Sequence, residues 1–304
     1  MVNRICFLTY LNRSGSTLLS KELDENFDVF VSIEAQFINR LVRKYKLPFS
    51  SLEFEKFKSD LFSESKFRSW KISQERLENR FHSLTFPIRL REVLDVILEE
   101  ATENKHSEYT IVKSGKHFKY YELLKAEYQD STFIFIKRDP RAIFNSASKS
   151  IDSRTKKVMQ DNVLRFCYVY KRSMRQVNML AKRKDFLIVG YEELVTNKES
   201  VLSKVSEFLE LPIVSRESRY HGRIPEGQKH LHGNLGSSLL QERIKGWAIE
   251  LGAREIYLIE RLIDKEMLLG GYNRLNPTVS VLTKMEGFLY QLFLKIVFLG
   301  QKLG

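Results

Sequence analysis

The sequence predicts an α/β protein: a doubly wound parallel sheet flanked by helices, with a helical insert after the second strand. Short apolar runs alternate with helical patterns along the 304 residues. The runs are continuously apolar, which is typical of strands buried on both faces of a parallel sheet. Hydrophobic residues make up 43% of the chain, enough for a core, so a charged disordered tail is excluded.

Five runs predict the strands of this sheet, in the order in which the chain presents them. They cover Arg4–Tyr10, residues 27–33, Tyr109–Lys113, Thr132–Lys137 and residues 186–191. Helical spacing fills residues 16–23, 36–105, 118–128, 139–184, 200–211 and 243–265, while residues 215–238 are polar and predict a loop. The 36–105 stretch, with breaks near Pro48 and Pro87, is the helical insert, and its recurrent aromatic residues indicate core packing.

The chain is expected to form one α/β domain over residues 1–277, followed by an apolar C-terminal helix or tail over residues 278–304. Residues 288–299 are strongly apolar but too few to span a bilayer, so we expect docking, a homodimer contact or peripheral membrane contact. Cys6 and Cys167 are too few for a disulfide framework, and the first residues lack a signal-peptide pattern. A cytoplasmic location is predicted, with attachment at the membrane as the alternative.

Basic residues exceed acidic ones, with a formal net charge of +12 and a pI near 9.5. Residues 137–184 hold 14 basic and 3 acidic side chains, net +11, which is nearly the whole excess. Such a concentration indicates a negatively charged partner: nucleic acid, an anionic membrane, or a phosphorylated or sulfated small molecule.

The loop after the first predicted strand has the features of an anion site. It consists of Arg13, Ser14, Gly15, Ser16 and Thr17. Backbone N–H groups and the positive end of the next helix dipole would converge on an anion, with hydroxyls and a guanidinium as further donors. The loop is not a Walker A motif, because Ser16 stands where that motif has Lys. The alternative interpretation is a simple N-cap turn.

A second anion site is predicted at the end of the fourth strand. Arg138 ends that strand, Pro140 suits the first turn of a helix, and Ser146 lies about two turns further on the same side. An Arg at the carboxyl end of a parallel strand and a hydroxyl on the next helix would grip a phosphate at the ligand-binding edge of the sheet. The alternative is a surface ion pair of Arg138 with a neighbouring acid.

These motifs, with the segment that begins at Tyr191, resemble the sulfotransferases that use 3′-phosphoadenosine 5′-phosphosulfate (PAPS), both bacterial or carbohydrate enzymes and tyrosylprotein enzymes. The resemblance implies a P-loop-type sheet in which the loop from Arg13 to Thr17 holds the 5′-phosphosulfate. It further implies that Arg138 and Ser146 hold the 3′-phosphate and that Tyr191 lies near the nucleotide. No metal is required.

The same resemblance implies two catalytic residues. Glu34, after the second strand, would take the proton of the acceptor hydroxyl, and Lys113, at the end of the third, would stabilise the transferring group. The alternative for Glu34 is a structural role, in which its carboxylate interacts favourably with the N-terminal end of the next helix dipole. The alternative to Lys113 as the catalytic cation is Lys116. His230 and His232 are expected to line the pocket, because their spacing does not suit a metal site.

The function predicted is therefore sulfuryl transfer from PAPS to a hydroxyl acceptor by in-line displacement. A glycan is the favoured acceptor, with peptide or lipid as alternatives, and nucleic acid is not expected as a partner. A divergent P-loop phosphotransferase and a non-enzymatic basic binder of nucleic acid or membrane surfaces remain as competing functions. The basic residues along 154–184 are either a solvated face or a docking surface for an acidic acceptor.

Overall fold

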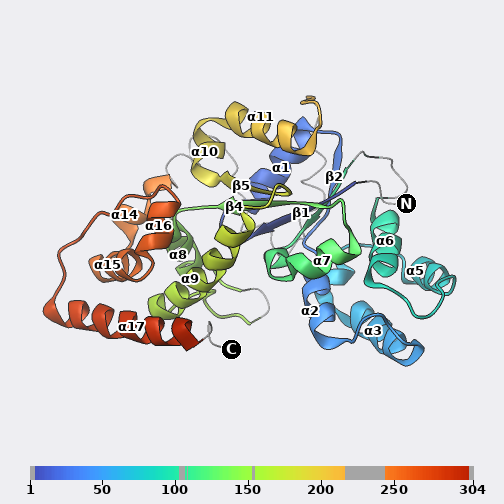
Figure 1. The fold of residues 1–304 in the computed structure, drawn as a ribbon, viewed down its shortest axis with the longest axis horizontal. Coiled ribbons are helices and arrows are strands. Elements are labelled where there is room, and N and C mark those ends of the chain that lie inside the picture. The colour runs from blue at the N-terminus through green and yellow to red at the C-terminus, as the bar shows by residue number, and fades with distance from the viewer. Residues whose placement is uncertain (1–3, 103–106, 108, 153–154, 216–243, 301–304) are drawn as a thin grey trace.

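The computed structural model describes residues 4–102, 107, 109–152, 155–215 and 244–300. Five parallel strands form a sheet with the order β2-β3-β1-β4-β5 (Figure 1). They are β1 (Arg4–Tyr10), β2 (Val29–Val31), β3 (Tyr109–Lys113), β4 (Thr132–Lys137) and β5 (Phe186–Gly190). β1 pairs with β3 on one side and with β4 on the other, so the strand order switches direction at β1. The doubly wound sheet predicted from the sequence is confirmed.

Strand side chains alternate between the two faces of the sheet, and both faces are buried. In β1, Ile5 and Phe7 pack into one layer, whereas Cys6 and Leu8 pack into the other, and all four are at most 3% exposed. A strand enclosed in this way needs apolar residues at consecutive positions, which is why the runs in the sequence do not alternate.

Helices cover both faces of the sheet (Figure 1). The Cys6 layer is closed by α1 (Ser16–Asn26), α10 (Tyr191–Thr196) and α11 (Lys198–Leu209). The Phe7 layer is closed by the 3-10 helix η1 (His117–Tyr120), α7 (Tyr121–Glu127), α8 (Pro140–Ser148) and α9 (Val163–Leu180).

The helical insert between β2 and β3 is also confirmed. It consists of α2 (Gln36–Lys44), α3 (Ser51–Ser63), α4 (Ser65–Arg68), α5 (Gln74–Phe81) and α6 (Leu90–Ala101). Its aromatic residues pack on one another: the ring centroids of Phe49 and Phe57 are 4.8 Å apart, and Phe54 stacks on Phe57 at 5.7 Å. The aromatic repeat is therefore mainly a core, although Phe86 is 45% exposed.

The structure differs from the sequence-based prediction in several element bounds. The helical stretch expected over 139–184 is two helices, because the chain leaves α8 at Lys149, forms a bridge between Ile151 and Val158, and enters α9 only at Val163. The second strand is shorter than residues 27–33, since the Phe27 N–H instead closes the end of α1 by bonding to Leu23. The remaining helices of the described ranges are α14 (Trp247–Glu250), α15 (Ala253–Leu262), α16 (Asp264–Leu269) and α17 (Val281–Gly300).

The turn from β4 into α8 is held by a buried ion network. Arg141 bonds Asp139 Oδ2 at 2.7 Å and Glu260 Oε1 at 2.6 Å, and its guanidinium lies 3.8 Å from the ring centre of Trp247. Asp139 also caps α8 by accepting the Arg141 N–H. Breaking a buried pair leaves an uncompensated charge, so this network fixes the corner from which Arg138 projects.

Candidate active site

The β1–α1 loop has a backbone shaped for close approach of a ligand. Arg13 and Gly15 both adopt left-handed conformations, with φ of 71° and 91°. The Ser14 N–H bonds back to the Leu11 carbonyl at 3.1 Å, and no side chain caps the first turn of α1. The Ser14 hydroxyl is buried with no hydrogen-bond partner among the described residues. Uncapped N–H groups at a helix N-terminus bind anions, and the loop thus has donors to offer one.

Tyr191 packs directly over this loop. A Cβ atom added to Gly15 would lie 2.2 Å from Cδ2 of Tyr191, closer than two carbon atoms can approach. The Arg138 guanidinium also contacts the Tyr191 ring, 4.2 Å from its centre. Tyr191 therefore joins the end of β5 to the loop after β1 and the end of β4.

Arg13 and Arg138 bring the two predicted anion sites together. Arg13 Nε donates to Ser146 Oγ at 3.0 Å, and Arg138 Nη1 donates to the Arg13 carbonyl oxygen at 3.0 Å. Arg138 is 7% exposed, so its side chain is buried in the protein and does not lie on the surface. The loop after β1 and the helix after β4 thus form one continuous basic site where the strand order switches direction, the place where α/β sheets bind ligands.

Lys113 lies beside the loop from its other side. Its ammonium is 3.4 Å from the Thr17 hydroxyl and 5.8 Å from the ring centre of Tyr10, and the residue is 6% exposed. Lys116, its rival in the sequence, is exposed to solvent. Only Lys113 of the two has a contact with the anion loop that the structure records.

Glu34 lies next to this cation at the end of β2. The Ala35 N–H donates to the Lys113 carbonyl at 2.7 Å, so the two chain segments run side by side. Oε1 of Glu34 accepts hydrogen bonds from Tyr10 Oη at 3.0 Å and from Gln36 Nε2 at 2.7 Å. These two hydrogen bonds fix the position of the carboxylate.

Tyr10 and Gln36 are site residues that the sequence analysis missed. Tyr10 is the last residue of β1, and the carboxyl ends of parallel strands share one edge of the sheet. Its position at the end of a predicted strand could therefore have identified it as a site residue. For Gln36 the sequence predicted only the first residue of a helix, and no pattern indicated a role in the site. His230, His232 and the rest of the predicted loop over 215–238 from residue 216 onward lie outside the described residues.

His117, the histidine that follows Lys113 in the chain, lies in the core. His117 is fully buried with its ring edge-on to Phe7, and burial lowers the pKa of its imidazole to about 3. Within the described ranges, no three His, Cys, Asp or Glu residues are grouped so that they could hold a metal ion.

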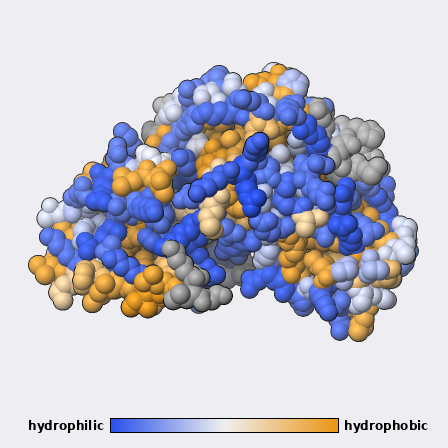
Figure 2. Space-filling view, in the orientation of Figure 1, coloured by the Kyte–Doolittle hydropathy of each residue, from blue (hydrophilic) through white to orange (hydrophobic). Residues whose placement is uncertain are grey.

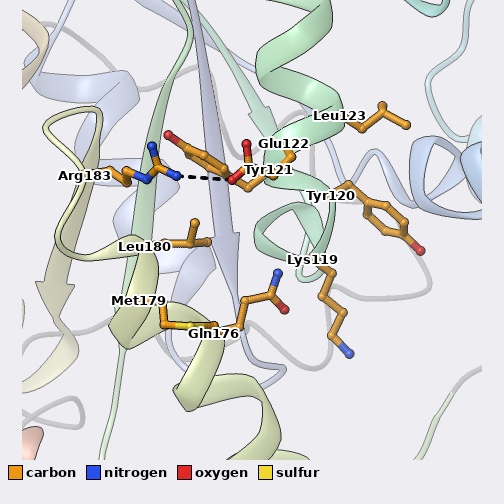
Figure 3. Close-up of a pocket in the computed structure, with 9 residues that line it drawn as sticks. All are labelled: Lys119, Tyr120, Tyr121, Glu122, Leu123, Gln176, Met179, Leu180 and Arg183. Carbon is orange, nitrogen blue, oxygen red and sulfur yellow. Dashed lines mark hydrogen bonds and ion pairs between the residues drawn. The ribbon is translucent and has the colours of Figure 1, made fainter. Parts of the chain in front are cut away.

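A cavity of about 470 Å³ lies on the Phe7 face of the sheet, apart from the anion loop. Figure 3 shows η1 and α7 on one side of it and α9 on the other, with Arg183 paired to Glu122 at one end. Lys119 and Gln176 line the remainder with apolar neighbours such as Met179.

A parallel sheet with a basic loop at its switch point is the arrangement with which α/β proteins bind ligands at the carboxyl ends of their strands. The chain belongs to the sulfotransferase family, whose model, described as "Sulfotransferase family", matches residues 6–215. It is an enzyme of sulfuryl transfer. No curated protein matches the sequence significantly.

Solved structures of sulfotransferase domains share the fold. The sulfotransferase domain from the curacin biosynthetic pathway superposes with a TM-score of 0.58 at 16% identity, over 90% of this chain and 99% of that one. The sulfotransferase domain from the Synechococcus PCC 7002 olefin synthase superposes with a TM-score of 0.57 at 14% identity, over 90% of this chain and 97% of that one.

Replacing Gly15 by Ala should destabilise the protein. The new methyl group would clash with the Tyr191 ring, and the left-handed backbone alone costs about 1–2 kcal/mol for a residue with a Cβ. We expect the thermal midpoint to fall by about 4 °C or more. Gly190→Ala is the matched control, because its Cβ would meet nothing closer than 3.6 Å. Equal midpoints for the two variants would show that the close packing on Gly15 is unimportant.

Proposed function

We propose that the chain transfers the sulfuryl group of PAPS to a hydroxyl of a glycan, with Glu34 as the general base. One observation carries the proposal: Lys113, on the strand beside β2, contacts Thr17 of the anion loop while its backbone bonds to the segment that carries Glu34. A cation and a base therefore flank the place where a group held by the loop would meet an acceptor.

The residues present fit the nucleotide. The loop from Arg13 to Thr17 offers uncapped N–H groups and the buried Ser14 hydroxyl to the 5′-phosphosulfate. Arg138 and Ser146 lie beside it for the 3′-phosphate, and Arg13 bonds to Ser146 between the two. PAPS supplies the activated sulfuryl group. The Tyr191 ring packs against Gly15 and supports this loop.

Each catalytic residue has one task in this proposal. Glu34 accepts the proton of the acceptor hydroxyl as the new oxygen–sulfur bond forms. Lys113 and the loop donors neutralise the charge that develops on the phosphate oxygen as the old sulfur–oxygen bond breaks. The products are a sulfate ester, 3′-phosphoadenosine 5′-phosphate (PAP) and a proton held by Glu34.

The acceptor is expected to approach along η1, which connects the site to two other helices. Tyr120 Oη donates to the Asn39 carbonyl of α2 at 3.3 Å, and Gln176 Nε2 of α9 donates to the Phe118 carbonyl at 2.9 Å. Both helices are thereby held against the segment that follows Lys113.

Four cations gather around that segment: Arg43, Lys116, Lys119 and Arg172. Arg43 lies one turn after the α2 residue in contact with η1, and Arg172 one turn before the α9 residue. Partial burial, and then repulsion by Lys116, Arg172 and Arg43, lowers the pKa of Lys119. No described residue forms an ion pair with any of the four. Such a cluster favours an acidic glycan, one with carboxylate or sulfate groups, as the acceptor.

Thermal stabilisation by PAP without magnesium tests the nucleotide part of this proposal. At a concentration of about 100 Kd, PAP should add about 2.7 kcal/mol to the free energy of unfolding. ATP with magnesium should add less. Stabilisation by magnesium–ATP alone would indicate the phosphotransferase instead, and steep salt-dependent binding of duplex nucleic acid without any response to PAP would indicate a non-enzymatic binder.

A matched pair of sugars tests the acidic acceptor. We expect oligogalacturonate to bind about 10-fold more tightly than its methyl ester, which has the same ring hydroxyls without the charge. Arg43→Gln with Lys119→Gln should abolish most of this difference, whereas Lys56→Gln, an exposed change on α3, should leave it intact. Equal binding of acid and ester, measured by calorimetry with PAP present, would contradict the acidic acceptor but leave the nucleotide site untouched.

A cytoplasmic location remains our expectation. Cys6 and Cys167 are free thiols, fully buried in different layers of the core, and burial raises the pKa of the Cys6 thiol to about 12. Neither thiol is in a disulfide, the bond that is typical of proteins in oxidising compartments.

A further inference from the structure

The C-terminal helix α17 has one face that packs on the protein and one wide apolar face that does not. Thr283, Gly287, Leu294 and Phe298 form the packed face. Large apolar side chains that are 41–78% exposed form the other: Val281, Leu282, Met285, Phe288, Leu289, Leu292, Phe293, Ile296 and Leu299. Figure 2 shows this apolar surface along the edge of the molecule where Figure 1 places α17. A patch of this extent on a soluble chain indicates an interaction site.

The packed face shows that α17 is docked in a definite orientation. A Cβ on Gly287 would lie 3.0 Å from Arg261 and 3.3 Å from Leu258, so the helix sits directly on α15. Near the other end, Phe298 stacks on Tyr168 of α9 at 5.7 Å, and the Arg175 guanidinium lies 3.9 Å from its ring centre. The exposed apolar face of α17 therefore points away from α9 and α15.

Cations border this apolar face on one side. With 3.6 residues per turn, Lys284 and Lys295 lie within about 20° of each other around the helix, between Phe298, which contacts α9, and Phe288 of the exposed face. Across that border, α9 presents Arg165, Arg172 and Arg175 to solvent. The acid on the opposite border, Glu286, is paired with Arg254. An apolar strip next to a row of unbalanced cations is complementary to a surface that is apolar inside and anionic outside.

We propose that the exposed face of α17 lies in the interface of an anionic lipid bilayer, parallel to its plane. Twenty residues give a helix of about 30 Å. None of the helices in the described part of the chain is long and apolar enough to cross the membrane. Lysine stems reach from such a helix to lipid headgroups, and in-plane helices bind through apolar area combined with attraction to anionic lipids. A second copy of the chain would bring the same cations to the contact, whereas anionic headgroups neutralise them.

Vesicle flotation of the whole protein tests this proposal. The vesicles are phosphatidylcholine, alone or with about one third phosphatidylglycerol. We expect binding to the anionic vesicles, at least about 10-fold weaker binding to the neutral ones, and a similar loss for Leu289→Ser with Ile296→Ser. Lys284→Gln with Lys295→Gln should weaken binding only to the anionic vesicles.

Leu52→Ser is the matched control, because Leu52 is 67% exposed on α3, away from α17. All these positions are on the surface, and an unchanged thermal midpoint and unchanged PAP binding confirm that each variant is folded. Equal flotation of the Leu289/Ile296 variant and the wild type would overturn the proposal. So would a wild-type dimer in light scattering that this variant converts to monomer without any vesicle binding, because the face would then be a contact between copies. The test does not depend on sulfuryl transfer.

Discussion

Glu34→Gln lowers kcat about 10²- to 10⁴-fold, the contribution of a positioned general base, and leaves the affinity for PAP unchanged. The amide still accepts the hydrogen bond of the Tyr10 hydroxyl but cannot take a proton. Single-turnover measurements with any hydroxyl compound that the enzyme sulfates, together with equilibrium binding of PAP, separate the two quantities.

Tyr10→Phe is the control for this variant, because it removes a hydrogen bond to the carboxylate and keeps the carboxylate itself. We expect a loss of no more than about 10-fold, the usual effect of one hydrogen bond. If Glu34→Gln retained more than a tenth of the wild-type kcat, another group would be the base. The Glu34 carboxylate would then only stabilise the N-terminus of α2 through the helix dipole.

Lys113→Ala lowers kcat about 10²- to 10³-fold, because one of the donors that neutralise the leaving group is lost. Its neighbour provides a sharp comparison. Lys116→Ala removes the same charge three residues further on, from a side chain in solvent, and should change kcat by less than about 3-fold while it weakens acidic acceptors. A larger loss in kcat for Lys116→Ala than for Lys113→Ala would reverse the assignment of the two lysines.

Periodicity and strand composition predicted the fold well because both follow from burial. Each β1 residue from Ile5 to Leu8 touches one of two apolar layers, so the pattern in the sequence reports the layers directly. Element bounds were predicted less well. Lys149 lies just past the end of α8 in a sequence that still looks helical, and only the turn held by the Ile151–Val158 bridge shows the break.

For the site, the sequence could indicate which residues end the strands but not how their side chains meet. Arg13 and Ser146 are far apart in the chain, and their hydrogen bond depends on β1 and β4 being neighbours. The choice between Lys113 and Lys116 depended on burial, which three residues of spacing do not reveal. Arg141 belongs to the same short motif as Arg138, yet it bonds to Glu260, an acid contributed by a helix over a hundred residues away.

The hydrogen bond from Arg13 to Ser146 links the two ends of the proposed nucleotide site, so that they move together. A ligand that fills one end restrains the guanidinium and thereby prepares the other end, so the two phosphates of PAP should bind cooperatively. Adenosine 5′-phosphate and adenosine 3′-phosphate would each lose more affinity than the missing phosphate alone accounts for. In this proposal, selectivity for a bisphosphate over a monophosphate follows from the bond that joins the β1–α1 loop to α8, in addition to the contacts that each of them makes.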